Sequence, residues 1–272
     1  MVDVRTATCS RAIPFQRMNN ADQSSKSPPV IEFREVGYRL ANQSLLQDIS
    51  FSAFAGETLV LLGRSGAGKT TALKLINRLL TPVYGEVRVN GRSTMSWDPI
   101  LLRRSIGWVI QESGLFPHYS VESNIAVVPK LEQWPRERVN ARISELMQLV
   151  GLDSNLRTRY PHQLSGGQRQ RVGVARALAA DPGILLMDEP FGALDPITRA
   201  ELQKEFLNLQ RRLGKTVVIV THDLREAMLL GTRIALFDTG KLVGVFACHD
   251  FANCQDERVR EYVAPFREAL PI

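Results

Sequence analysis

The chain has 272 residues, enough for one large domain or two small ones, which excludes a long repeat array. The composition, 44% hydrophobic and 23% charged with 19 glycines and 14 prolines, is typical of a soluble globular protein and excludes collagen, coiled coil and extensive disorder. The net charge of +6 is modest and includes no dense run of Lys or Arg, so we expect no nucleic acid as a partner.

Neither a membrane span nor a secretory signal is visible in the chain. No stretch approaches the ~20 consecutive apolar residues that a membrane-spanning helix needs, and the N-terminal residues lack an apolar signal core. We therefore expect a cytoplasmic protein. The cysteines Cys9, Cys248 and Cys254 are odd in number and have no metal-binding spacing, which argues against a disulfide framework or a zinc site.

The first part of the chain divides into a tail and a strand-rich segment. Residues 1–29 are polar and end in two prolines, so we expect a mobile tail. A membrane-contacting arm, or a true start at Met18, are the alternative interpretations. Short apolar runs at residues 31–33, 49–54 and 58–62 each predict a strand.

The first predicted helix follows these strands. Residues 69–80 place apolar side chains at helical spacing, and Pro82 ends the pattern. Further along, residues 184–187 and 216–221 are continuous apolar runs of the kind found in parallel strands buried on both faces. The outline is that of an α/β protein.

A helical segment interrupts this α/β outline. No strand-like run appears between residues 111 and 181, where helical patterns cover residues 139–152 and 168–180 instead. A short helical pattern also spans residues 257–270 near the end of the chain. We expect the central segment to be a helical insert in the α/β core.

A glycine-rich segment between the third predicted strand and the first helix fits the pattern G-x-x-x-x-G-K-[ST]. We call residues Gly63–Thr70 the glycine loop. Its backbone N–H groups can form an anion-binding concavity at the positive end of the following helix. Lys69 adds a charge for the β- and γ-phosphates of a nucleotide, and the Thr70 hydroxyl can ligate Mg²⁺. The strand and helix on either side argue against a turn that only caps a helix.

Two acids follow the predicted strand at residues 184–187. Acids at the carboxyl end of a buried strand lie where open α/β sheets bind ligands. Asp188 is suited to hold Mg²⁺ through its water shell, and Glu189 could accept a proton from the water that attacks the γ-phosphate. Solvated acids are common at strand ends, so the prediction depends on the glycine loop being present as well.

A second glycine motif, Leu164–Gln168, precedes the helical run at residues 169–180. We expect Ser165 to cap that helix, whose free N–H groups could also bind phosphate. A capped helix with a flexible Gly-Gly entry is the simpler interpretation. The functional one is favoured because the motif lies about twenty residues before the acid pair.

Together with Gln111, Asp195 and His222, these motifs resemble the nucleotide-binding subunits of ATP-binding-cassette (ABC) transporters over residues 31–265. The resemblance implies a P-loop NTPase core of the RecA type, an N-terminal antiparallel β portion and an inserted α-helical subdomain. It divides the chain into a tail at 1–29, an ABC ATPase domain at 30–265 with the subdomain at about 112–180, and a C-terminal end at 266–272.

The resemblance also implies roles for individual residues, with ATP and Mg²⁺ as cofactors. Glu189, His222, Gln111 and Lys69 would be catalytic. The expected Mg²⁺ ligands are Thr70, Gln111 and Asp188. The expected nucleotide contacts are Gly63, Arg64, Ser65, Gly66, Ala67, Gly68, Lys69, Thr70, Thr71, Ser165, Gly166, Gly167, Gln168 and Asp195.

In this family two subunits enclose two ATP molecules head to tail. The resemblance therefore implies that Ser165, Gly166, Gly167 and Gln168 act on nucleotide held by the opposite subunit, which Asp195 would contact. The aromatic that usually stacks on adenine is missing: Leu40 stands at its place, and Tyr38 lies two residues earlier. The adenine contact is left open between these two residues.

The segments around residues 106–134, 159–182 and 195–206 resemble in particular the ATPases of importers for quaternary-amine osmoprotectants such as glycine betaine, choline or carnitine. The resemblance implies an ATPase dimer, homodimeric or pseudo-symmetric, on the cytoplasmic face of the membrane. Its partners would be integral membrane permease subunits and, indirectly, an extracytoplasmic solute-binding protein. The alternatives are an importer ATPase for another solute, such as an amino acid or lipid, and an ABC ATPase outside transport.

Overall fold

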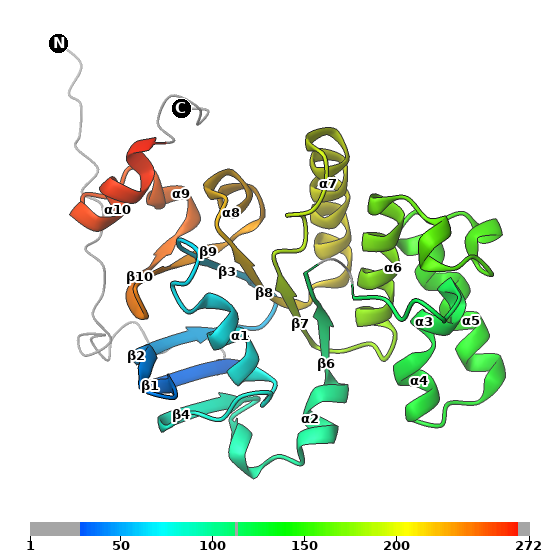
Figure 1. Ribbon diagram of the computed structural model, residues 1–272, viewed down its shortest axis with the longest axis horizontal. Coiled ribbons are helices and arrows are strands. Elements are labelled where there is room, and N and C mark those ends of the chain that lie inside the picture. The colour runs from blue at the N-terminus through cyan, green and yellow to red at the C-terminus, as the bar shows by residue number, and fades with distance from the viewer. Residues whose placement is uncertain (1–27, 112–113, 266–272) are drawn as a thin grey trace.

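The computed structural model describes residues 28–111 and 114–265, and the figures show how their helices and strands are arranged (Figure 1). The larger sheet has six strands in the order β10-β9-β3-β8-β7-β6. Strands β6, β7, β8, β3 and β9 run parallel, and β10 pairs antiparallel with β9. The strands of this sheet are β3 (Thr58–Leu62), β6 (Ile106–Val109), β7 (Ile184–Asp188), β8 (Thr216–Thr221), β9 (Arg233–Asp238) and β10 (Lys241–Ala247).

The smaller sheet is antiparallel and has the order β2-β1-β4-β5. Its strands are β1 (Ile31–Leu40), β2 (Gln43–Ala53), β4 (Tyr84–Val89) and β5 (Arg92–Ser93). A stacked ring pair, Phe33 and Phe51 with centroids 4.4 Å apart, lies between the first two strands. This sheet is the N-terminal antiparallel portion that the family resemblance implies.

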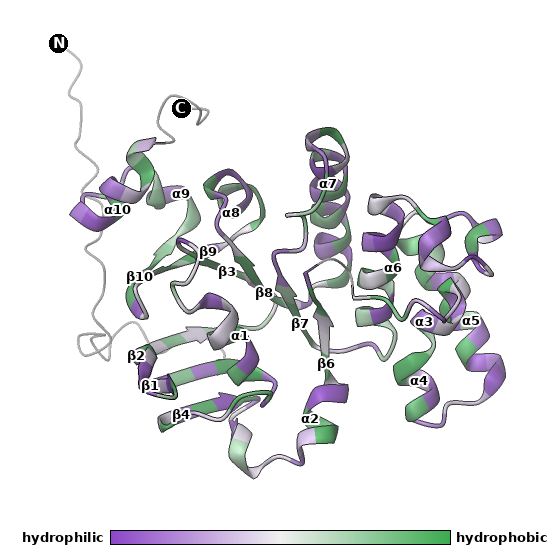
Figure 2. Cartoon of the chain, in the orientation of Figure 1, coloured by the Kyte–Doolittle hydropathy of each residue, from purple (hydrophilic) through white to green (hydrophobic). Residues whose placement is uncertain are grey.

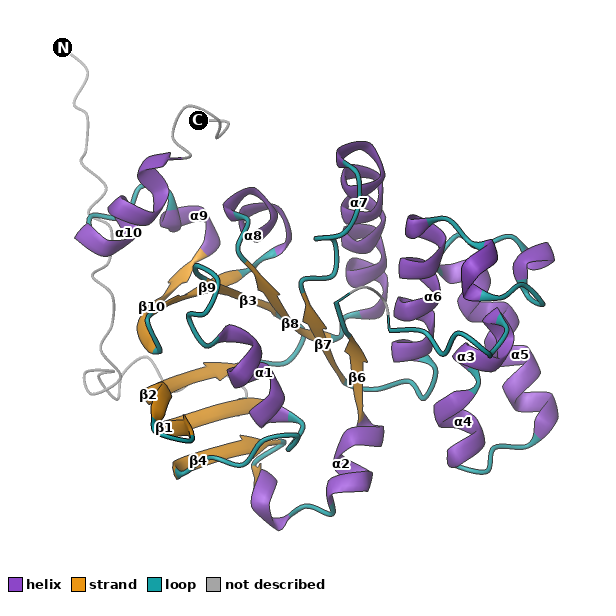
Figure 3. Cartoon of the chain, viewed as in Figure 1, coloured by secondary structure: helices purple, strands orange, loops and turns teal. Residues whose placement is uncertain are grey.

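Helices pack on both faces of the larger sheet (Figure 3). The described α-helices are α1 (Lys69–Ile76), α2 (Pro99–Ser105), α3 (Val121–Ile125), α4 (Val127–Leu131), α5 (Arg136–Leu149), α6 (Gly166–Leu178), α7 (Pro196–Leu213), α8 (Leu224–Leu230), α9 (Cys248–Phe251) and α10 (Glu257–Val263). Between β6 and β7 the described elements are all helical, and Figure 1 shows α3, α4, α5 and α6 grouped at one side of the sheet.

The two faces of the larger sheet belong to two hydrophobic clusters because successive side chains of a strand point to opposite faces. Leu59 and Leu61 of β3 pack with α1 and the smaller sheet, whereas Val60 and Leu62 pack with α7, α8 and the helical segment. All five residues of β3 and of β7 are buried, and Figure 2 shows these central strands as apolar. Full burial of each large aliphatic side chain contributes roughly 1.5–3 kcal/mol.

The predicted strands at 58–62 and 216–221 have the same bounds in the structure, and the one at 184–187 gains Asp188. Residues 31–33 are part of the longer β1, and residues 49–53 are part of the longer β2, which ends one residue before Phe54. Strands β4, β5, β6, β9 and β10 were not predicted.

The predicted first helix, residues 69–80, was four residues too long. Helix α1 ends at Ile76, and Arg78 takes a left-handed conformation with φ 54°. The N–H groups of Leu79 and Leu80 both bond to the Lys74 carbonyl. The apolar pattern continues past Ile76 because Leu80 still packs against the core, although the chain is no longer helical.

The tail predicted at residues 1–29 lies almost entirely outside the described residues, as do residues 266–272. Within the described ranges, no helix combines the length and the hydropathy that crossing a membrane would require.

Candidate functional site

The glycine loop connects β3 to α1 at the carboxyl end of the sheet. Gly68 is the N-cap of α1 and has φ 96°, a conformation that side-chain-bearing residues rarely adopt. A Cβ atom at this position would lie 2.6 Å from Leu46 Cδ2 and 2.8 Å from the Leu45 carbonyl oxygen. Both the backbone angle and the close approach of β2 therefore require glycine here.

Lys69, at the start of α1, turns its ammonium group back onto the glycine loop. Its Nζ donates to the carbonyl oxygens of Gly63 at 2.7 Å and Arg64 at 2.9 Å. The residue is only 4% exposed. Burial lowers the pKa of Lys69, and the nearby acids Glu189 and Asp188 partly offset that effect.

Thr70 joins α1 to the end of β7. Its Oγ1 donates to Asp188 Oδ1 at 2.8 Å, although the two residues are 118 positions apart. Asp188 is 8% exposed, and burial raises the pKa of its carboxyl group, while the bond from Thr70 acts in the opposite direction. The hydroxyl and the carboxylate that sequence reasoning assigned to Mg²⁺ thus lie in contact.

Glu189 and His222 meet at the ends of neighbouring parallel strands. Strand β7 pairs with β8 in a register that places Asp188 beside Val220, and the Glu189 N–H donates to the Val220 carbonyl at 2.9 Å. His222 Nδ1 lies 3.3 Å from Glu189 Oε1. Glu189 has φ 44°, a strained conformation of the kind that clusters at functional sites.

The second glycine motif begins α6 with a capping box. Ser165 Oγ accepts from the Gln168 N–H at 3.2 Å, and Gln168 Oε1 accepts from the Ser165 N–H at 2.9 Å. A cavity of about 250 Å³, lined by Gly166, Arg169, Gln170, Glu189, Pro190, Ala193 and Leu194, lies between this helix start and the acid after β7.

Asp195 caps α7 by accepting a hydrogen bond from the Thr198 N–H at 3.0 Å. That contact with Thr198 lowers the pKa of the exposed Asp195 carboxyl. Gln111 is exposed two residues after the end of β6, beside residues 112–113, which the structure does not describe. Among the remaining candidates, Arg64, Ser65 and Gly66 are exposed, Thr71 is half-buried and Ala67 is buried.

The two candidates for the adenine contact differ in exposure. Leu40, at the end of β1, is 62% exposed. Tyr38 is partly buried and packs against the cluster between the two sheets.

Sequence reasoning missed three residues around the turn that carries His222. Tyr262 of α10 donates from its hydroxyl to the His222 carbonyl at 3.1 Å. Arg199 Nη1 lies 4.0 Å from Asp223 Oδ2, and Glu226 accepts a hydrogen bond from Thr221. The only sequence signal for any of them is the spacing of Asp223 and Glu226, which fits a capping box at the start of α8.

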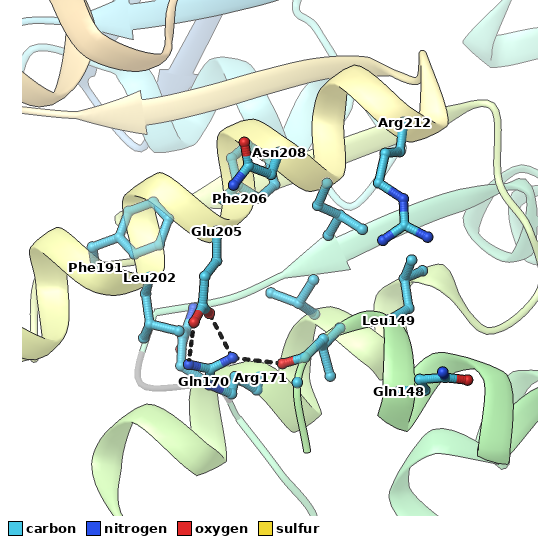
Figure 4. A pocket seen from close by; sticks show the side chains of 14 residues that line it. Gln148, Leu149, Gln170, Arg171, Phe191, Leu202, Glu205, Phe206, Asn208 and Arg212 are labelled. Carbon is cyan, nitrogen blue, oxygen red and sulfur yellow. Dashed lines mark hydrogen bonds and ion pairs between the residues drawn. The ribbon is translucent and has the colours of Figure 1, made fainter. Parts of the chain in front are cut away.

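A second cavity of about 250 Å³ lies between α5, α6 and α7, and none of its lining residues belongs to the predicted site (Figure 4). The Arg171–Glu205 ion pair crosses it at 2.5 Å, and Arg171 also donates to the Val150 carbonyl at 2.7 Å. These contacts join the helical segment to α7, so we interpret the cavity as a packing gap between them.

Comparisons with known proteins identify the family. Residues 46–192 match the family model described as ABC transporter. The chain therefore belongs to the ABC transporter family and carries its ATP-binding domain. Its fold is that of the P-loop NTPase cassettes, as the sequence resemblance implied.

Two curated relatives and one solved structure define the similarity further. The glycine betaine uptake system ATP-binding protein YehX of Escherichia coli is 54% identical, over 79% of this chain and 70% of that protein. The glycine betaine/carnitine/choline transport ATP-binding protein OpuCA of Bacillus subtilis is 49% identical, over 82% of this chain and 59% of that protein. The ATP-binding cassette MJ0796, solved as a dimer in a post-hydrolysis state bound to ADP and Pi, is 32% identical with a TM-score of 0.72, covering 80% of this chain and 98% of that one.

Most of these relatives are longer than the match. The chain spans between 50% and 59% of the length of OpuCA and of four further relatives named for choline, carnitine or osmoprotectant transport.

Proposed function

We propose that this chain is the ATP-hydrolysing subunit of an ABC importer for a small solute. The hydrogen bond of 2.8 Å from Thr70 to Asp188 carries the proposal. It joins the glycine loop to the end of β7, where Glu189 and His222 also meet. An anion-binding loop, a buried carboxylate and a candidate base therefore share one edge of the sheet, as phosphoryl transfer to water requires.

We propose Thr70, Asp188 and Gln111 as the residues that hold Mg²⁺. Their hydroxyl, carboxylate and amide oxygens are the donors that this cation prefers. Asp188 is a buried carboxylate whose pKa is raised by burial, and a cation beside it would favour its charged form. The described residues hold no group of three or more His, Cys, Asp or Glu side chains suited to a metal ion, which agrees with a cation bound mainly through water and nucleotide phosphates. When bound, Mg²⁺ would neutralise charge on the phosphates.

We assign the other site residues as the family resemblance implies. Lys69 and the N–H groups of the glycine loop bind the phosphates, with Arg64, Ser65 and Thr71 beside them. Glu189 accepts the proton of the attacking water, and His222, 3.3 Å from it, orients Glu189 and the γ-phosphate. For the contact with the adenine ring of ATP we assign Leu40, because its side chain is exposed and that of Tyr38 packs inward.

The second glycine motif and Asp195 act across a dimer in this proposal. Ser165, Gly166, Gly167 and Gln168 would contact the nucleotide of the opposite subunit, and the solved MJ0796 cassettes, which are dimeric, support such an assembly. Gln111 and the residues up to Ser120 would meet a permease subunit. The assembly would thus lie at the cytoplasmic face of the membrane.

We also propose the domain division given above, with the ATPase domain at residues 30–265 and the helical subdomain at about 112–180. The succession of α3, α4, α5 and α6 between β6 and β7 supports the insertion.

The proposed cargo is a quaternary-amine osmoprotectant such as glycine betaine or choline, delivered by a separate solute-binding protein. The names of the relatives YehX and OpuCA support this cargo. Another small solute is the alternative. In this proposal the permease and the solute-binding protein contact the cargo, so the specificity would belong to these partner proteins.

Uptake by cells that contain the chain with its permease and binding protein tests the proposal. Labelled glycine betaine and choline should accumulate with the wild-type chain and not with Glu189→Gln. Accumulation of a different small solute, with neither glycine betaine nor choline accumulating, would show that this solute is the cargo. Glu189→Gln hydrolysing ATP at the wild-type rate would contradict the assigned base, and co-purification with ribosomes or DNA in place of a membrane protein would contradict transport.

A further inference from the structure

Glu226 is a buried carboxylate that the proposed function does not use. It lies in the first turn of α8 and is 5% exposed. Its Oε2 accepts a hydrogen bond from Thr221 Oγ1 at 3.0 Å, and Thr221 Oγ1 accepts one from the Asp223 N–H at 3.0 Å. The two bonds fix the residues on both sides of His222.

Arg199 holds the loop after Glu189 in a comparable way. It lies near the start of α7, and its Nη2 donates to the carbonyl oxygens of Leu194 at 3.1 Å and Gly192 at 3.4 Å. Its Nη1 lies 4.0 Å from Asp223 Oδ2. One guanidinium therefore contacts the loop that follows Glu189 and also approaches the turn that carries His222.

Glu226 and Arg199 each have one buried atom that lacks a partner. Within residues 28–111 and 114–265, neither Glu226 Oε1 nor Arg199 Nε has a hydrogen-bond partner. The first is an acceptor and the second a donor. A buried polar atom without a partner destabilises the structure that contains it, so a relative movement of α7 and α8 that joins these two atoms would be favoured.

The charges around Glu226 are consistent with such a bond. Burial raises the pKa of Glu226 to about 7. The negative charges of Asp223, which caps the same helix, and of Glu189, at the end of β7, raise this pKa as well. The hydrogen bond from Thr221 and the positive charge of Arg199 lower it. Arg199 is the cation among these neighbours, so pairing with it would stabilise the ionised carboxylate.

We propose that Arg199 and Glu226 are positioning residues that bond to each other when nucleotide closes the site, and that this bond holds His222 against Glu189. The inference rests on the proposed function because it concerns the rate of ATP hydrolysis. The pair would connect two loops that both lead to the reacting phosphate.

Two substitutions test the proposed bond, and the first leaves the existing contacts of Arg199 in place. Glu226→Gln keeps an oxygen acceptor for Thr221 but presents an amide donor to Arg199 Nε, which cannot accept. Arg199→Lys keeps the charge but lacks Nε, and it also lacks the Nη2 group that donates to the carbonyls of Gly192 and Leu194. Glu201→Gln on α7 and Arg225→Lys on α8 are matched controls, because they make the same changes at exposed positions of the same two helices.

The experiment measures kcat and KM for ATP of the wild type, both single variants and the double variant, in the assembly that hydrolyses ATP. We expect each single variant to lower kcat about tenfold with KM within about twofold, and the double variant to be no slower than either single one. The controls should match the wild type. A double variant whose loss is the product of the single losses, or losses confined to KM, would overturn the inference. If Glu226→Gln does not fold, Arg199→Lys alone decides, and a kcat within about twofold of the wild type overturns the inference.

The proposed function fails separately, if the wild-type chain does not hydrolyse ATP or Glu189→Gln hydrolyses it normally. With both of those results as expected, independent effects of the Arg199 and Glu226 variants would remove the positioning pair alone.

Discussion

Lys69 has a buried ammonium group whose hydrogen-bond partners are carbonyl oxygens of the loop that it would serve. Lys69→Ala removes the positive charge and both bonds, so we expect most ATP binding to be lost, on the order of a hundredfold in Kd. Titration with a fluorescent ATP analogue measures the loss. Lys130→Ala, at an exposed position of α4, is the control. An unchanged affinity for Lys69→Ala would refute the phosphate-binding role of the glycine loop.

Burial of Glu226 makes stability depend on pH. Its pKa rises from 4.5 to about 7 in the folded chain, so the unfolded chain ionises first as pH rises. Below about pH 4.5 the raised pKa does not change the free energy of unfolding. Between about pH 4.5 and pH 7 it lowers that free energy progressively, and above pH 7 the loss is constant at about 3 kcal/mol.

Glu226→Gln does not titrate, so its stability relative to the wild type should increase between pH 5 and pH 7 and then level off. Urea unfolding at pH 5, 6, 7 and 8 measures this difference. Glu201→Gln, at an exposed position, should show none of the trend. A difference that falls as pH rises would show that the buried carboxylate is stabilised in its charged form.

Sequence reasoning at the residue scale found what is local in the chain. The pattern of Gly63–Thr70 and the acids after β7 could be located because the chemistry depends on a few residue types at fixed spacing. Glu226 could not be found in this way. Its spacing from Asp223 predicts a bond back to the Asp223 N–H, whereas in the structure that carboxylate accepts from Thr221. The tertiary structure therefore determines whether Glu226 bonds to the Asp223 N–H or to Thr221.

Among the elements, α10 has an unexpected contact with the site. Its Tyr262 donates to the His222 carbonyl, and burial raises the pKa of that phenol to about 12, so the hydroxyl stays protonated at neutral pH. Helix α10 thereby supports the turn between β8 and α8.

Tyr262→Phe removes the hydroxyl and keeps the ring. We expect ATP hydrolysis to fall several-fold with little change in folding, because one hydrogen bond of this kind contributes roughly 0.5–1.5 kcal/mol. Steady-state kinetics and thermal unfolding measure the two effects. Tyr84→Phe, at an exposed position of β4, is the matched control. Wild-type turnover in Tyr262→Phe would mean that α10 does not support the His222 turn.

The strands that sequence reasoning predicted and those it missed differ in length and pattern. Strands β3, β7 and β8 are continuous apolar runs because both of their faces are buried. Strand β6 has four residues, too few for its pattern to stand out, and β10 lies at the sheet edge with only part of its residues buried. Helix α1 ended early because Arg78 leaves the helical conformation while Leu80 continues to pack.

For the whole molecule, the central prediction is an ATP-dependent dimer. Glu189→Gln should bind ATP without hydrolysing it, and because each nucleotide would contact both subunits, the dimer should persist. Light scattering after size exclusion, with ATP and Mg²⁺ or with ADP, measures the change in mass. The same variant with ADP is the control and should remain monomeric. A monomer in the presence of ATP would exclude the proposed action of Ser165 and Asp195 across subunits.

The family, the glycine loop, the acid pair and the central strands could all be predicted from the sequence, because each depends on residues that are close together in the chain. Which distant groups meet depends on the tertiary fold. Thr70 reaches Asp188 across 118 positions, and His222 reaches Glu189 because β8 lies beside β7 in parallel register. The unpaired atoms of Arg199 and Glu226 also emerged only from the fold. Strand order and helix packing set these distances, and neither can be read from local spacing.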